Sequence, residues 1–224
     1  MVNSKHAFWQ ALIAAIVILG IGIAFGFFLE NSRADSIQLA LLNSEINLLD
    51  EQIRNKQIEQ MNMDCQIAAQ STYKFADKIY FEALKLEEFN DAAKFTDTLK
   101  ILHKRYDLLR MMLWLESVQL KEKCSPEIHT VVYLFEFDTQ NINQKAKQSA
   151  ISRMLTDLKN KHGEEIILIP IAGNLELESV NLALEKYHVS KLPALIIDEE
   201  IIIEDPSQFV TFEQIENAIF PNNK

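Results

Sequence analysis

The sequence predicts an α/β domain at the C-terminus, behind an α-helical stalk and one transmembrane helix. Three observations lead to this prediction. Residues 11–29 form an uncharged apolar run, residues 36–62 contain neither glycine nor proline, and short β-rich runs alternate with helical patterns after residue 128. Alternating strands and helices are typical of an α/β domain. The predicted parts are a transmembrane anchor (1–33), an all-α hairpin or coiled-coil stalk (34–124) and the α/β domain (125–224).

The composition limits the classes of function. The chain has 224 residues and a net charge of −10, with 32 acidic against 22 basic side chains. So acidic a surface repels phosphate backbones, and we expect no nucleic-acid partner. His103 and His129 have no cysteine or carboxylate at ligand spacing, so we expect no metal site. The acidic pairs Glu164–Glu165 and Glu199–Glu200 lie at segment edges, and we interpret them as solvated turns. Because no phosphate loop or other catalytic motif is present, we also expect no cofactor.

The run at residues 11–29 predicts a helix that spans a bilayer. It carries no charge, and a spanning helix needs about 20 apolar residues. Trp9 precedes the run, and Phe27 and Phe28 lie near its end, as aromatic side chains do at membrane interfaces. A soluble helix would normally show a polar stripe, and this one shows none. We therefore expect a membrane anchor.

The residues within and beside this run suggest its orientation and a partner. Lys5 precedes the run, whereas Arg33 follows it beside acidic residues, so we expect a single-pass protein with its N-terminus inside and its C-terminal domain extracytoplasmic. Gly22 and Gly26 have the spacing that lets two helices approach closely, which offers a face for a homodimer, although glycine is also common in membrane helices. A cleaved signal peptide is the alternative, with small side chains in residues 32–34, but the length of the run favours retention.

Residues 36–62 predict a helix with a coiled-coil seam, because apolar side chains recur at alternating steps of three and four. The seam consists of Leu39, Leu42, Ile46, Leu49 and Ile53. It is short, since Lys56 and Gln60 interrupt it. We therefore favour a helix that packs on its neighbours within the chain over a zipper between two chains.

Two further helices, 64–88 and 91–123, predict an αα-hairpin with Asn90 as the N-cap. Cys65 opens the first helix and Cys124 follows the second, so the hairpin brings both to the same side. The second arm is longer by about ten residues, which at a rise of 1.5 Å per residue is an offset of about 15 Å. A disulfide does not span that distance without a bend. A Cys65–Cys124 disulfide and two unpaired structural cysteines both stay open.

The pattern after residue 128 predicts a mixed four-stranded sheet in the order β-α-β-α-β-β-α, with helices on both faces. The run 165–171 is nearly continuously apolar, as in a strand that is covered on both faces. A helix between the first two strands makes them parallel, and the last two are close enough for a hairpin. The predicted elements are strand 129–137, helix 143–160, strand 165–171, helix 175–187, strands 194–197 and 201–204, and helix 212–219, which Thr211 and Gln214 would cap.

One stretch of this domain, Tyr187-His-Val189-Ser-Lys-Leu192-Pro193-Ala194, resembles a run in thioredoxin-like proteins. In that family a tyrosine and a valine precede an apolar residue, a proline and the third strand. The resemblance covers roughly residues 127–220. It implies a thioredoxin-like fold and a cis Leu192–Pro193 peptide bond, in a loop that faces the active site of the family.

The chain departs from that family where the redox cysteines would lie. The Cys-x-x-Cys motif of the family follows the first strand, and alignment of the strands puts Thr139 and Ile142 at the positions of the two sulfurs. No cysteine follows Cys124. Because thiol–disulfide exchange needs a thiolate, we expect none here, and we interpret Thr139 as a helix N-cap.

A retained proline loop without cysteines predicts a membrane-anchored, non-catalytic binding or assembly module. We expect its partner to be a protein or an extended peptide, recognised through main-chain groups. The candidate groove residues are Thr139, Ile142, Leu192 and Pro193. Two alternatives stay open. One is a membrane-tethered thiol–disulfide oxidoreductase that uses Cys65 and Cys124, and the other is a structural subunit of a membrane complex.

Overall fold

The computed structural model describes residues 4–61, 63–91, 96–124, 128–206 and 212–221. Within its helices, it leaves out the side chains of residues 4–7, 10–11, 27–44, 84–91 and 96–99. The chain divides into two compact units, residues 1–54 and 55–224. The long helix α1 (Ser4–Gln60) makes up the first unit and contributes its last turn and a half to the second.

The structure contradicts the predicted transmembrane anchor. Over the residues that it describes, no helix joins enough length to enough apolar character to cross a bilayer. The single-pass topology, the inside N-terminus and the extracytoplasmic C-terminal domain depended on that anchor, and they are corrected with it. The predicted boundary at residue 33 is also absent. The helix runs unbroken from Ser4 to Gln60, because neither glycine nor proline follows Gly26 within it.

The residues predicted to mark the anchor lie on an open helix surface. Trp9 is 61 % exposed. A Cβ added at Gly22 or Gly26 would meet no other atom within 4 Å. The side chains of Phe27 and Phe28 lie outside the described part of the chain. Within the predicted seam, Ile46, Leu49 and Ile53 are exposed, while Leu39 and Leu42 also lie outside the described side chains.

The second unit begins with a helical hairpin of α2 (Cys65–Asp91) and α3 (Thr96–Cys124). The two helices were predicted, but α2 ends at Asp91 and α3 begins at Thr96, a few residues later than expected. Asn90 is inside α2 and is not the N-cap of the next helix. The two arms are therefore nearly equal, with 27 and 29 residues. At 1.5 Å per residue their ends differ by only about 3 Å.

The sheet confirms the predicted order of elements. Its strands lie in the order β2-β1-β3-β4, with β1 parallel to β2 and the other two pairs antiparallel. The elements after the hairpin are β1 (His129–Phe135), α4 (Ile142–His162), the 3₁₀ turn η1 (Gly163–Glu165), β2 (Ile166–Ala172), α5 (Glu178–Lys186), β3 (Ala194–Ile197), β4 (Ile201–Glu204) and α6 (Phe212–Ile219).

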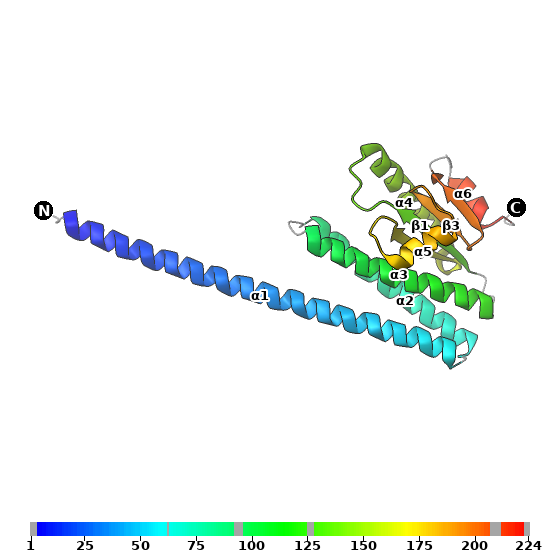
Figure 1. Ribbon diagram of the computed structural model, residues 1–224, viewed down its shortest axis with the longest axis horizontal. Coiled ribbons are helices and arrows are strands. Elements are labelled where there is room, and N and C mark those ends of the chain that lie inside the picture. The colour runs from blue at the N-terminus through cyan, green and yellow to red at the C-terminus, as the bar shows by residue number, and fades with distance from the viewer. Residues whose placement is uncertain (1–3, 62, 92–95, 125–127, 207–211, 222–224) are drawn as a thin grey trace. The chain divides into compact units, whose positions relative to one another are not determined.

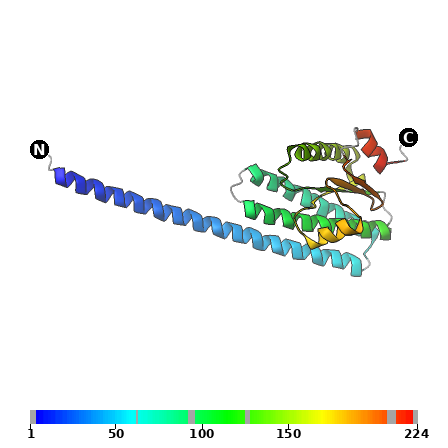
Figure 2. The same cartoon turned by 45° about the horizontal axis from the view of Figure 1, so that its top comes forward.

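Helices cover both faces of this sheet (Figures 1 and 2). The α4 and α6 side holds a core of alternate strand residues, because neighbouring side chains of a strand point to opposite faces. That core contains Val131, Tyr133, Ile151, Leu155, Leu158, Ile166, Leu195, Ile197, Ile215 and Ile219. On the other face, α3 lies against β1 and β2 and also contacts α5. The predicted sheet, covered on both faces, is thus confirmed, and α3 of the hairpin is one of its covers.

Candidate functional site

Three connections lie at one end of the strands, which we call the carboxyl edge: those that follow β1 and β2, and the one that precedes β3. β1 and β2 are parallel and end at Phe135 and Ala172, so their carboxyl ends lie side by side. β3 runs antiparallel to β1 and pairs Ala194 with Leu134. Pro193 therefore enters the sheet at the same edge. In α/β folds, the carboxyl ends of parallel strands are where ligands most often bind.

The Leu192–Pro193 peptide bond is cis, as the resemblance implied. Pro193 is buried and Leu192 is half-buried. The side-chain amide of Gln144, in the first turn of α4, donates to the carbonyl oxygen of Leu192 at 2.6 Å. The Leu192 side chain lies against Gly173, where a Cβ would come within 2.8 Å of Leu192 Cδ1. The proline loop is thus held between α4 and the end of β2.

This contact yields a first prediction. Gly173→Ala should shift Leu192, because the added methyl group overlaps the end of its side chain. A flexible leucine can move aside, so we expect a loss of only about 1 kcal/mol in unfolding free energy. Urea unfolding measures the stability, and methyl NMR of Leu192 measures the shift. An unmoved leucine methyl resonance would contradict this packing.

The other two predicted groove residues differ from expectation in part. Thr139 is half-buried in the loop, and its hydroxyl accepts only the N–H of Asn141, at 3.3 Å. The N-cap of α4 is Asn141, whose side-chain oxygen accepts from Asn143 and Gln144. The N-cap prediction was therefore wrong by two residues. Ile142 follows the cap and is 83 % exposed.

Side-chain amides hold the loop between β1 and α4. Phe137 donates its N–H to Asn174 Oδ1 at 2.7 Å, and Asn174 Nδ2 donates back to the Phe137 carbonyl at 2.9 Å. Gln148 makes the same reciprocal pair with the backbone of Glu136, at 2.8 and 3.0 Å. Each amide continues the hydrogen bonding of a strand beyond its end. Neither amide was predicted from the sequence, because an amide with this role has no spacing signature.

A polar stripe on α3 reaches the same edge. Asp107 is only 1 % exposed and accepts from the Ala172 N–H and from Arg110 Nη1, both at 3.2 Å. Burial raises the pKa of Asp107 to about 6, although Arg110 and the Ala172 N–H oppose the shift. The spacing of His103, Asp107 and Arg110 puts all three on one helix face. That spacing is the signal in the sequence from which this stripe could have been predicted.

His103 sits above the loop with its ring against Phe137, the two ring centres 4.3 Å apart. Burial lowers its pKa to about 4, and the nearby Arg110 adds to the effect. The imidazole is therefore neutral at physiological pH. Its Nε2 is buried and has no hydrogen-bond partner among the residues that the structure describes. A neutral ring of this kind packs against the loop and is not poised to exchange protons near neutral pH.

An ion-pair cluster lies at the opposite end of the strands, around the β3–β4 turn. Lys121 contacts Asp198 at 3.0 Å and Glu199 at 2.5 Å. His129 contacts the second oxygen of Asp198 at 2.6 Å, and Trp114 Nε1 donates to Glu199 at 2.8 Å. Burial would raise the pKa of Asp198, but these contacts outweigh it and hold the pKa below its usual value. Glu199 was predicted to be solvated, and it instead joins the β3–β4 turn to α3.

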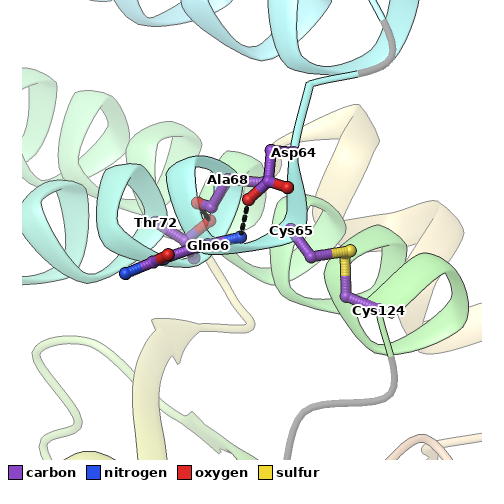
Figure 3. The surroundings of a disulfide bond; sticks show 6 residues. All are labelled: Asp64, Cys65, Gln66, Ala68, Thr72 and Cys124. Atoms are coloured by element: carbon purple, nitrogen blue, oxygen red, sulfur yellow. Dashed lines mark hydrogen bonds between the residues drawn. A yellow bond between two sulfur atoms is a disulfide. The ribbon is translucent and has the colours of Figure 1, made fainter.

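The two cysteines form a disulfide, with 5.6 Å between their Cα atoms. Cys65 begins α2 and Cys124 ends α3, so the nearly equal arms remove the predicted obstacle (Figure 3). Asp64, just before Cys65, accepts the N–H of Gln66 at 2.8 Å and so helps to start α2. The disulfide tethers the two helices where they would otherwise separate.

A cavity of about 250 Å³ lies beside the disulfide, between the end of α1 and the hairpin. Its lining is mainly apolar, with Thr72 and Glu116 as buried polar groups. The Thr72 hydroxyl donates to Glu116 at 2.6 Å. The carboxylate is thus already engaged within the protein. The cavity lies far from the proline loop, because Cys124 precedes β1 whereas Pro193 meets its end, about 20 Å along the strand.

No protein family, no curated protein and no solved structure matches this chain. Among the residues that the structure describes, no three His, Cys, Asp or Glu side chains are grouped to hold a metal ion. The arrangement at the carboxyl edge can therefore be judged only by its own chemistry. It offers a buried proline loop, backbone held by side-chain amides, and the exposed side chain of Ile142.

Proposed function

We propose that residues 125–224 form a thioredoxin-like, non-catalytic binding or assembly module. The observation that carries the proposal is the cis Leu192–Pro193 loop at a sheet edge that contains no cysteine. Thiolate chemistry is absent there, because the chain has no cysteine after Cys124 and both cysteines are joined to each other. The ligand that suits this edge is an extended segment of a protein.

Recognition would use the main chain of the loop. The Leu192 carbonyl accepts a hydrogen bond from Gln144 Nε2. The same carbonyl is an acceptor suited to the N–H of a bound peptide. An incoming segment would exchange its own N–H for that amide. Ile142, 83 % exposed two residues before Gln144, supplies apolar surface beside the loop. Main-chain bonds give affinity and a neighbouring apolar contact gives selectivity.

The test is a selection of peptides from a random display library against the full chain, followed by affinity measurements on variants. Gln144→Ala removes the internal competitor, and the net value of one hydrogen bond predicts an affinity about 2- to 10-fold higher. Gly173→Ala shifts the Leu192 side chain beside the loop and should lower the affinity about fivefold, the equivalent of about 1 kcal/mol. Leu182→Ala is the matched control, since Leu182 is an exposed aliphatic residue on α5.

The outcomes separate recognition from structural support. If Gln144 merely braces the loop, its removal would weaken binding, because the loop would lose its order. Peptides whose affinity ignores both Gln144→Ala and Gly173→Ala would mean that the groove is not where they bind. In that case the proposed module is wrong at this site.

One alternative function is that of a thiol–disulfide oxidoreductase that uses Cys65 and Cys124. Its supporting observation is that the two cysteines pair and that Cys65 is exposed. Against it, the pair lies at the other end of the sheet from the proline loop. Insulin reduction by the chain, with Cys124→Ser as the control, decides between the two: a rate equal to that of the variant excludes the oxidoreductase.

A further inference from the structure

The strand β4 forms an open edge of the sheet. It follows β3 at the end of the order β2-β1-β3-β4, and among the described residues β3 is its only strand partner. The side chains of Ile201 and Ile202 are each 42 % exposed. An exposed edge with apolar side chains offers pairing to another chain, and proteins usually protect such edges.

The main-chain groups that face this open edge can be assigned from the register. Asp205 donates its N–H to the Pro193 carbonyl at 3.0 Å, so that pair is hydrogen-bonded. Bonded and non-bonded pairs alternate in an antiparallel ladder. Ile201 and Ile203 therefore bond inward to β3, whereas Ile202 and Glu204 direct their N–H and C=O groups outward. In the described part of the chain, no backbone or side-chain group bonds to those outward groups.

The sequence of the edge sets the kind of partner. Residues 198–205 read Asp-Glu-Glu-Ile-Ile-Ile-Glu-Asp, so three isoleucines lie between two groups of carboxylates. Asp198 and Glu199 are held by Lys121 at one end, while Asp205 pairs with Lys147 at the other. Glu204 accepts the backbone N–H groups of Ser190 and Lys191. Glu200 is exposed and next to the strand. No basic residue lies within the segment. Its complement is a strand with a β-branched core and a basic residue at each end.

A second copy of the chain fits this edge poorly. If two copies of β4 pair antiparallel about the strand centre, the acidic group at one end lies opposite the acidic group at the other end. If they pair parallel, each acidic group lies opposite the same group of the second copy. Like charges directly across a sheet are destabilising. The carboxylates at each end thus disfavour the pairing of two β4 edges and favour a basic partner.

We propose that β4 is a strand-addition site for an extended peptide whose apolar, β-branched core is flanked by Lys or Arg. The peptide would exchange main-chain hydrogen bonds with Ile202 and Glu204, while its side chains cover Ile201 and Ile202. This site is separate from the groove of the proposed function. The groove depends on the Leu192 carbonyl and Gly173, whereas the edge depends on β4 alone.

The test uses the full chain and a fluorescent peptide with a Val-Thr-Val core between two lysine pairs. We expect saturable binding, and at least tenfold weaker binding of the peptide in which glutamates replace the lysines. Ile202→Pro removes one outward N–H without removing an inward ladder bond, and should cost at least tenfold in affinity. Glu200→Lys should weaken binding about threefold or more at low salt, and high salt should reduce that difference.

Hydrogen exchange gives a readout that does not depend on a variant. On peptide binding, the amides of Ile202 and Glu204 should exchange more slowly, whereas those of Ile201 and Ile203 are already protected by β3. Equal binding of the lysine and glutamate peptides, or unchanged exchange at Ile202 and Glu204, overturns the proposal. If Gly173→Ala weakens binding and Ile202→Pro does not, the peptide lies in the groove, and the edge proposal fails while the proposed function stands.

Discussion

Reduction of the Cys65–Cys124 disulfide should lower the unfolding free energy by about 4 kcal/mol. The bond closes a loop with a sequence separation of 59 residues. Cross-linking a loop of that length removes conformational entropy from the unfolded chain, and the chain-entropy relation gives about 4 kcal/mol. For a domain of this size, that loss corresponds to a fall in melting temperature on the order of 10 °C.

The measurement is thermal and urea unfolding with and without dithiothreitol, with the thiols counted by mass spectrometry. The Cys65→Ser, Cys124→Ser double variant is the control, because the reductant should leave its stability unchanged. The reduced wild type and the double variant should then agree. If fully reduced protein melts at the same temperature as oxidised protein, the hairpin does not need its covalent tether.

Relative to the Asp107→Asn variant, the wild-type protein should lose about 3 kcal/mol of stability between pH 4 and neutral pH. Burial raises the pKa of Asp107 from 3.8 to about 6, and each unit corresponds to about 1.4 kcal/mol. The folded state therefore binds this proton more tightly than the unfolded chain does. The sign follows: the group costs nothing below pH 4, and stability is lost as pH rises from about 4 to about 6. Asparagine keeps the shape and an acceptor for the Ala172 N–H without the charge.

The comparison is the stability of the variant minus that of the wild type, measured by urea unfolding between pH 4 and pH 7.5. We expect a difference near zero at pH 4 that grows through pH 6. Asp157→Asn, on the exposed side of α4, should show no such growth. A destabilised Asp107→Asn variant at neutral pH would show instead that the Arg110 ion pair outweighs the cost of burial.

The strands were predictable because burial on both faces of the sheet requires short, continuous apolar runs in the sequence. Ile166–Ala172 and Ala194–Ile197 are short apolar runs between polar turns, and both were found within a residue of their observed bounds. The cis Leu192–Pro193 bond was also correctly expected, since a local motif carried it. Features of this kind can be predicted from the sequence because each depends on a few adjacent residues.

The errors came where the outcome depends on distant residues. Glu199 looks like a solvated turn until α3 brings Lys121 and Trp114 to it. The role of Asp107 as an acceptor for the Ala172 N–H becomes evident only when α3 lies against β2. The membrane anchor was inferred from the apolar run at residues 11–29 and its aromatic flanks, which are local features. The thioredoxin-like character of the sheet remains a proposal, since its support is one motif and an order of elements.

The loops at the carboxyl ends of β1 and β2 are tied by the amides of Gln144, Gln148 and Asn174. Two carboxylates also hold backbone there: Glu204 accepts the N–H groups of Ser190 and Lys191, and Asp107 accepts that of Ala172. Amides neither gain nor lose a proton across the range of acidity that proteins experience. The amide contacts therefore present the same pattern of donors and acceptors in an acidic or an alkaline medium. Acidity should act on these loops through the carboxylates of Glu204 and Asp107, which accept backbone N–H groups from them.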